Sequence, residues 1–274
     1  MFNKKKELQR LQAENARLRA ALENGTADAS KDAPRRSAEF WYSPAGYSWS
    51  LCDDILSGVH CLIAGTTGCG KSTLVNSIIF SALLKSPAET RFILCDPKRV
   101  ELARYKNLPH VLRYAADADA ICDAIDYTIE IMERRFKAME ADRVQQFTSG
   151  PKIYVIIDEL ADMMLSPLAK RFTRSLQRLL QLARAASISV IACTQAPCKA
   201  VIPAPIQLNM YARVGLHCLS SIESRQAIGA AGCENLPLHG IGYYVDGIKT
   251  VKTEIPLTPA QEIAERIEFW ESQV

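Results

Sequence analysis

The chain has 274 residues, of which 48% are hydrophobic and 23% are charged, and its formal net charge is +3. This is the composition of a globular protein, and the charge is too small to identify a polyanionic partner without a local basic cluster. The nine cysteines are scattered and no Cys-x-x-Cys pair occurs, which argues against a disulfide framework and a zinc site. No apolar run reaches the ~18–20 residues of a membrane-spanning helix and no signal-peptide pattern is present, so we expect a cytoplasmic protein without membrane insertion.

Residues 1–23 predict a helix that is separate from the rest of the chain. The a and d positions of a short heptad seam are occupied by Leu8, Leu11, Asn15, Leu18 and Leu22. Asn at an a position favours a two-stranded coiled coil that pairs with another copy or another protein, whereas fewer than three heptads also fit a single amphipathic helix. Residues 24–39 are rich in Gly, Ala, Ser, Asp and Pro, which predicts a flexible linker before a globular domain over 40–274.

A phosphate-binding loop is the most informative motif of the chain. Residues 65–72 match the pattern G-x-x-x-x-G-K-[ST], between a strand-like run at 59–64 and a helix-like run at 72–79. Such a loop turns its backbone N–H groups toward phosphates, its lysine reaches the β- and γ-phosphates, and its serine hydroxyl holds Mg²⁺. A plain glycine turn does not explain the Lys and Ser together, so we expect ATP and Mg²⁺ as cofactors. The predicted nucleotide contacts are Gly65, Thr66, Thr67, Gly68, Cys69, Gly70, Lys71, Ser72 and Thr73.

An acidic pair follows a second buried strand. Residues 153–157 form an apolar run that is typical of a buried parallel strand, and the run ends in Asp158-Glu159. At a strand end beside the phosphate loop, Asp158 can join Ser72 in holding Mg²⁺, and Glu159 can orient or deprotonate the attacking water. Two solvated acids are the alternative interpretation. Together with the complete loop, the pair predicts ATP hydrolysis rather than binding alone.

The remaining elements alternate between strand and helix, which predicts an α/β fold with a mainly parallel sheet. Strands are expected at 91–95, 188–193 and 211–218, and helices at 118–139 and 167–185. Two strands at 241–245 and 248–251 flank Asp246-Gly247, which predicts a hairpin with a type I′ turn. Residues 258–261 resemble a capping box with Pro259 at the first helical position, opening a last helix.

Several motifs resemble those of the FtsK/SpoIIIE DNA translocases, which are P-loop ATPases of the FtsK–HerA type. The loop of this family favours Ala-Gly-Thr-Thr-Gly-Ser-Gly-Lys-Ser, and residues 64–72 follow it except at Cys69. Further matching segments, in the order of the family, are Cys95-Asp96-Pro97-Lys98, Met132–Phe136, Ile157–Asp162, Ala183–Ala186, Cys193-Thr194-Gln195 and Ser221–Arg225. The resemblance covers roughly residues 55–250.

This resemblance implies a RecA-like fold and a ring, usually hexameric, with nucleotide between subunits and double-stranded DNA in the pore. Gln195 is then placed to contact the γ-phosphate or the attacking water. Arg184 and Arg225 are the two candidates for an arginine that reaches the phosphate from a neighbouring subunit, although either can instead make a structural ion pair. Asp96, Lys98 and Glu101 resemble a family motif beside the nucleotide, without an assigned role.

DNA contacts are predicted on one helix and one loop. Lys170, Arg171, Arg174 and Arg178 fall in the expected helix at 167–185, where the three arginines recur at spacings of three and four. Such a stripe suits contacts to phosphates without base reading, and a solvated helix face is the alternative. Lys199, in the loop after Gln195, is a further candidate for a pore contact.

Some features depart from the family pattern. Cys69 replaces a small polar residue and is expected to make the loop sensitive to oxidation. Gln195-Ala196-Pro197 lacks the Arg often found there, and the sequence after residue 258 is too short for the module that reads orienting DNA sequences. We therefore expect a minimal motor. The alternatives are a coupling or secretion ATPase that moves a nucleoprotein or protein, and a nucleotide-dependent switch or assembly factor; a small-molecule kinase fits least.

Overall fold

The structure is a computed structural model that describes residues 49–273. The helix predicted at 1–23, the linker at 24–39 and the start of the globular domain near residue 40 lie outside the described residues. None of the helices within 49–273 combines the length and the apolar character that crossing a membrane requires.

One eight-stranded sheet organises the described residues, with the order β3-β2-β4-β5-β1-β6-β7-β8. The first six strands in this order are parallel, and β7 and β8 extend the sheet as an antiparallel hairpin. The strands are β1 (Cys61–Ala64), β2 (Thr90–Cys95), β3 (Val111–Ala115), β4 (Lys152–Ile157), β5 (Ile188–Thr194), β6 (Ala212–Gly215), β7 (Ile241–Val245) and β8 (Thr250–Glu254). The predicted mainly parallel α/β sheet of a RecA-like P-loop fold is confirmed.

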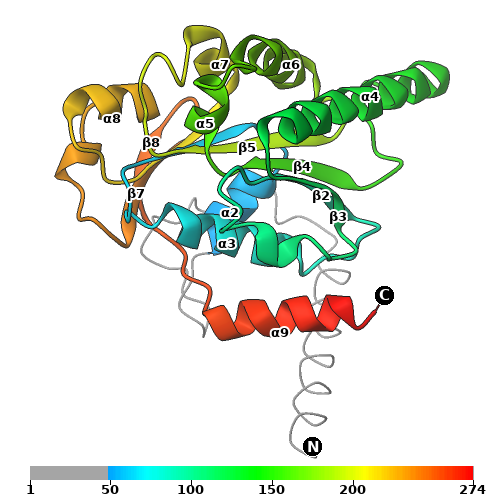
Figure 1. The fold of residues 1–274 in the computed structure, drawn as a ribbon, viewed down its shortest axis with the longest axis horizontal. Coiled ribbons are helices and arrows are strands. Elements are labelled where there is room, and N and C mark those ends of the chain that lie inside the picture. Colours follow the sequence, from blue (N-terminus) through cyan, green and yellow to red (C-terminus); the bar gives the residue numbers. More distant parts are fainter. Residues whose placement is uncertain (1–48, 274) are drawn as a thin grey trace, which may run out of the picture. The chain divides into compact units, whose positions relative to one another are not determined.

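Helices cover both faces of this sheet (Figure 1). On one face lie α4 (Ala118–Asp142), α5 (Leu160–Met164), α6 (Ala169–Leu182) and α7 (Ala204–Asn209), and on the other lie α2 (Trp49–Leu56), α3 (Lys71–Ala82) and α9 (Ala260–Glu271). The remaining helix is α8 (Ser221–Ile228), and the 3₁₀ turns are η1 (Ala103–Tyr105) and η2 (Cys233–Asn235). Every residue of β1 and β5 is buried, and these central strands are largely apolar instead of alternating between apolar and polar residues.

Each face has its own hydrophobic core. One core joins Val155 of β4 and Leu62 of β1 to Phe172 of α6, and the other joins Ile156 and Ile63 to the helices on the opposite face. Successive residues of a strand point to opposite faces, so each central strand supplies side chains to both cores. The sheet is therefore held rigidly from both sides, and its loops are positioned by buried strand ends.

The structure corrects two turn predictions. In the β7–β8 connection Gly247 has a left-handed φ of 83° but Asp246 does not, so the turn is not type I′. Instead a four-residue loop is closed by Asp246, whose carboxylate accepts from the N–H groups of Ile248 and Lys249. Helix α9 begins one residue later than predicted, so its N-cap is Pro259, which has no side-chain acceptor, and Thr258 instead donates its hydroxyl to Ser77 Oγ of α3 at 3.0 Å.

Other elements differ in extent from the sequence prediction. Strand β6 is shorter than the range 211–218, and the helix expected at 167–185 is α6, which covers 169–182. Five elements are additional to those predicted, namely α2, β3, α5, α7 and α8. Strand β3 was not predicted because it is an edge strand whose residues range from exposed to buried, so it has no continuous apolar run.

Candidate nucleotide site

Three strand ends meet at the carboxyl edge of the sheet. Strand β5 lies between β1 and β4, so the loop after β1, the acidic pair after β4 and Gln195 after β5 are neighbours in space. This edge is where ligands bind in open parallel α/β sheets. The sequence prediction that these three motifs act together is consistent with this order.

The loop of residues 65–70 depends on its glycines in two different ways. Gly68 and Gly70 have φ values of 78° and 97°, in the left-handed region that side chains disfavour. Gly65 is required for space, because a Cβ atom there would lie 2.7 Å from both Cys69 Sγ and Leu216 Cβ. Gly70 is also the residue from which α3 begins, so the helix points its N-terminal dipole end at the loop.

Lys71 is a buried cation without a hydrogen-bond partner. Its side chain is 5% exposed, and its Nζ lies 3.5 Å from Oε2 of Glu159, which is beyond a good hydrogen bond. Among the described residues its Nζ is one of the few buried polar atoms that no group satisfies. A buried ammonium with free donors at the start of a helix fits the phosphates of a nucleotide.

Glu159 is held by several donors. Its carboxylate accepts from the backbone N–H of Ala161 at 3.2 Å and of Gln195 at 3.1 and 3.2 Å. Lys98 approaches the same oxygen as Lys71, with Nζ 3.6 Å from Oε2. These contacts fix the side chain at the end of β4, between the loop after β1 and the loop after β2.

The carboxylates around Asp158 suit a divalent cation. The pKa of Asp158 is raised from 3.8 to about 6, mainly by burial; Lys71 opposes this rise, and the nearby carboxylates of Asp96, Glu101 and Glu159 add to it. Asp96 is fully buried, and its Oδ1 has no hydrogen-bond partner among the described residues. Mg²⁺ prefers one or two carboxylates together with phosphate and water oxygens. Asp158 and the Ser72 hydroxyl fit that pattern, so the predicted pair of ligands is compatible with the structure.

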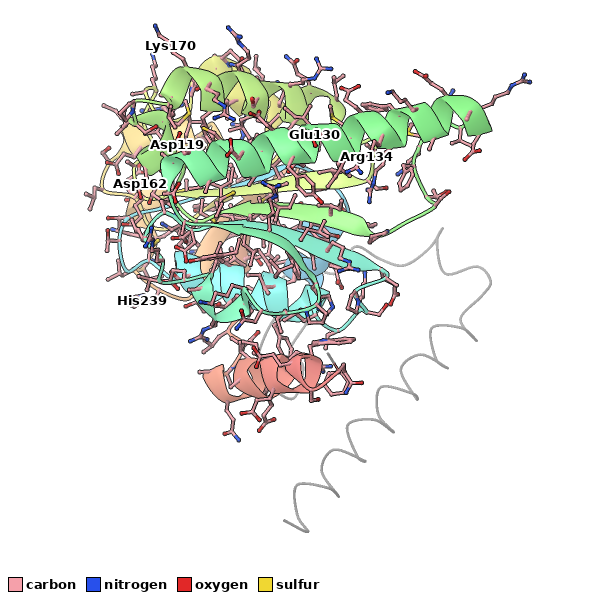
Figure 2. The ribbon with its side chains drawn as sticks, turned by 45° about the vertical axis from the view of Figure 1, so that its right-hand side comes forward. Asp119, Glu130, Arg134, Asp162, Lys170 and His239 are labelled. Atoms are coloured by element: carbon pink, nitrogen blue, oxygen red, sulfur yellow. The ribbon has the colours of Figure 1, made fainter. Side chains whose placement is uncertain are left out.

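Gln195 closes the site on the side of β5. Thr67 donates its hydroxyl to Gln195 Oε1 at 2.7 Å, which joins the phosphate loop to the end of β5. The loop and Gln195 line a cavity of about 240 Å³ together with His239. Figure 2 shows His239 at the same end of the domain as Asp162, which follows β4. Nothing in the sequence near His239 marked it, because only the path of the β7 connection brings it to this edge.

The structure contradicts the expectation that Cys69 is sensitive to oxidation. The side chain is 1% exposed, and burial raises the pKa of its thiol. A protonated and covered thiol is a poor nucleophile. Cys69 therefore packs against Gly65 and does not act as a redox-sensitive group.

Neither arginine candidate lies inside this site. Arg184 is exposed in the turn before Ile188, where β5 begins, and Gln195 follows the opposite end of the same strand. Arg225 is exposed on α8, where its guanidinium donates to Ser221 Oγ at 3.3 Å. Their role in another subunit's site stays a prediction.

Two of the predicted DNA-contacting arginines are paired with acids of α4. Arg171 contacts Asp123 at 2.7 Å and Asp126 at 2.6 Å, and Arg178 contacts Glu133 at 2.6 Å. These partners join α6 to α4 across the surface of the domain. The sequence did not reveal them, because the acids lie about 45 residues earlier in the chain.

The other two basic residues of α6 face an open groove. This shallow depression, of about 460 Å³, is lined by Ala169, Lys170, Thr173, Arg174 and Gln177. Lys170 lies at the start of α6, so it shares the carboxyl edge of the sheet with Lys199, which is exposed in the loop after β5. The predicted basic face is thus divided into a paired half and an open half.

Sequence comparisons agree with this geometry. Residues 49–151 match the FtsK/SpoIIIE family. The chain is 33% identical over 237 residues to DNA translocase FtsK of Tropheryma whipplei, covering 78% of this chain and 32% of that protein. It is 39% identical over 199 residues to DNA translocase SftA of Bacillus subtilis, covering 67% of this chain and 21% of that protein. The chain carries a domain of the FtsK/SpoIIIE family.

The FtsK/SpoIIIE domain described here spans at most about a third of the length of these curated relatives. Solved structures share its fold at lower identity. The pCW3 conjugation coupling protein TcpA, solved with ATPγS, has a TM-score of 0.68 and 20% identity, over 77% of this chain and 65% of that chain. ATPases 2 and 3 of EssC from Geobacillus thermodenitrificans have a TM-score of 0.67 and 19% identity, over 80% of this chain and 44% of that chain. The described residues thus have the fold of these P-loop ATPases.

Proposed function

We propose that this domain is an ATP-driven motor that moves double-stranded DNA in the cytoplasm, working as a ring. The observation that carries the proposal is the placement of the buried Lys71 and Glu159 beside Gln195 at one sheet edge, in a chain whose curated relatives are named DNA translocases. A buried cation such as Lys71, whose Nζ has no hydrogen-bond partner among the described residues, marks a site of chemistry rather than a structural ion pair.

Each residue of the site has a distinct part in hydrolysis. Lys71 and the N–H groups of the loop bind the phosphates, and Ser72 and Asp158 hold Mg²⁺, which neutralises charge on the phosphate oxygens when it is bound. Glu159 accepts the proton of the attacking water. Gln195, linked to the loop through Thr67, orients the water or the γ-phosphate.

Arg184 is proposed to act on the nucleotide of a neighbouring subunit in the ring. Because Arg184 lies at the far end of β5 from Gln195, it cannot serve the site of its own chain, whereas in a ring it is free to face the next subunit's nucleotide. Arg225 on α8 is the second candidate for this role. Mixing inactive Arg184→Ala and Lys71→Ala proteins should restore part of the ATPase activity; no recovery at any ratio would remove Arg184 from this role.

DNA is proposed to contact the open half of α6. Lys170 and Arg174 line the groove on α6, and Lys199 is exposed in the loop after β5. Sequence-independent contacts to phosphates need only such exposed cations. Arg171 and Arg178 are engaged by α4 and contribute less. The helix predicted at 1–23 is proposed to bind a partner protein or another copy.

The test is the ATPase rate with and without long duplex DNA, using Lys71→Ala as the blank. We expect strong stimulation in the parent protein and its loss in Lys170→Ala/Arg174→Ala. The matched control is Arg134→Ala/Lys137→Ala, which removes two exposed cations from α4 instead. Hydrolysis that ignores DNA would favour a coupling or secretion motor, an alternative supported by the shared fold of TcpA and EssC.

A further inference from the structure

Lys98 is a second cation at the catalytic glutamate. It follows β2 in the chain, and its Nζ lies 3.6 Å from Oε2 of Glu159. Lys71 reaches the same oxygen from the phosphate loop, at 3.5 Å. Two ammonium groups from different loops thus share one oxygen of a side chain that is 3% exposed.

The two lysines differ in what else they can bind. Lys71 is buried at the start of α3, beside the loop N–H groups that receive phosphate. Lys98 stands outside the phosphate loop, and its side chain is 42% exposed. When the donors of Lys71 turn to phosphate, the contacts left to Glu159 in the described part of the chain are Lys98 and the backbone N–H groups of Ala161 and Gln195.

Asp96 stabilises the loop that carries Lys98. Oδ2 of this buried carboxylate accepts from the backbone N–H of Leu102 at 3.0 Å, which closes the loop. Arg99 has a φ of 59°, a left-handed conformation that is uncommon for a residue with a side chain. Its N–H donates to Asp96 O at 3.1 Å and its Nε to Ala116 O at 3.4 Å. The direction of Lys98 is therefore set by the backbone around it.

We infer that Lys98 is a positioning residue for Glu159, which it keeps in place while Lys71 binds phosphate. Without it, the carboxylate has a single cationic neighbour and is drawn toward Lys71 and away from the position of the attacking water. This inference rests on the proposed ATP hydrolysis and assigns a role to the loop at 96–102. Lys98 acts through Glu159, so its removal should slow turnover more than it weakens nucleotide binding.

The kinetic test compares Lys98→Met with Lys98→Arg, both measured without DNA. A well-positioned base is worth about 100-fold or more in rate, so we expect kcat to fall about tenfold or more in Lys98→Met. The dissociation constant of a fluorescent ATP analogue should change by less than about threefold, and Lys98→Arg should recover much of the rate. Lys106→Met removes an exposed lysine eight residues later in the chain and should behave as the parent. An unchanged kcat, or equal losses in kcat and binding, would overturn the inference.

A second measurement uses nucleotide-free protein in EDTA. Lys98→Met should lower Tm by about 1–3 °C, as expected for loss of one weak ion pair in a domain of this size, and should have no such effect in a Glu159→Gln background. Equal shifts in both backgrounds would mean that Lys98 does not interact with Glu159. If Glu159→Gln itself hydrolyses ATP at the parental rate, the proposed role of Glu159 fails, while this thermal cycle still tests the contact.

Discussion

The two edges of the sheet treat buried charge in opposite ways. At the amino edge Arg135 is 8% exposed, and its guanidinium donates to the carbonyls of Ala186, Ser187 and Pro151. At the carboxyl edge Lys71 is as deeply buried and has no hydrogen-bond partner among the described residues. The first charge is satisfied within the chain and holds it together, whereas the second is kept for a ligand.

Glu159→Gln tests the carboxyl edge with the largest expected effect. The amide keeps the shape of the side chain but accepts no proton, so ATP hydrolysis should fall by about 100-fold or more while ATP still binds. Steady-state turnover and binding of a fluorescent ATP analogue measure the two quantities. Turnover comparable to the parent would show that another group activates the water.

Arg135→Ala tests the amino edge. It leaves the carbonyls of Ala186 and Pro151 without this donor, while Ser187 O keeps the N–H of Ile153 at 3.0 Å. It also removes the cation that lies 4.4 Å from the centre of the Phe147 ring. We expect the free energy of unfolding to fall by about 2–4 kcal/mol, since unsatisfied buried groups are costly. Urea denaturation measures this free energy, and Arg134→Ala, which removes the adjacent exposed arginine, is the control. If Arg135→Ala destabilises the protein less than the control does, Arg135 does not stabilise the amino edge.

Asp158→Asn should sharpen the contrast, because it stabilises the fold and removes function. The raised pKa of Asp158, about 6 against 3.8, means that its burial costs nothing below about pH 4 and costs more as the pH rises through 6. The amide avoids this cost, so in EDTA at pH 7 the variant should be more stable by about 3 kcal/mol. The gain should disappear near pH 4. A variant less stable than the parent at pH 7 would show that the carboxylate is satisfied without a metal.

His60 gives the smallest effect and lies at the amino edge. Burial, helped by Arg184, lowers the pKa of His60 to about 4, and its Nδ1 accepts from the N–H of Val190 at 3.0 Å. The unfolded chain binds the proton more readily, so stability is full above about pH 6.5 and is lost as the pH falls toward 4. Between pH 7 and 5.5 the free energy of unfolding should fall by about 1 kcal/mol because of His60. His60→Asn retains a hydrogen-bond acceptor but does not titrate, so denaturation curves of this variant should not show that fall. Identical pH dependence in both proteins would contradict this.

The sequence predicted well what depends on local pattern. The apolar runs of β4 and β5 and the glycine loop before Lys71 each carry their signal within about ten residues, because burial and backbone geometry act locally there. Strand β3 was missed because its exposed Arg113 breaks the pattern of a buried strand.

What depends on distant segments was not predictable. The face shared by Arg171 and Arg178 was correct as helical geometry, yet their acids come from α4. Thr258 is a residue type that commonly caps helices, but its hydroxyl donates to Ser77 Oγ of α3. His239 reaches the cavity, and Lys98 reaches Glu159, only because separate strand ends share one edge.

The hydrogen bonds between Ser77 and the last described residues determine where this domain can be truncated. Ser77 Oγ donates to Pro256 O and accepts from the N–H and hydroxyl of Thr258, while Trp270 donates to Leu83 O at the other end of α3. Helix α3 begins at the phosphate loop, so α9 supports the helix that carries the proposed nucleotide-binding loop. A truncation after the β7–β8 hairpin would look natural in the sequence, but it would strip α3 of its support.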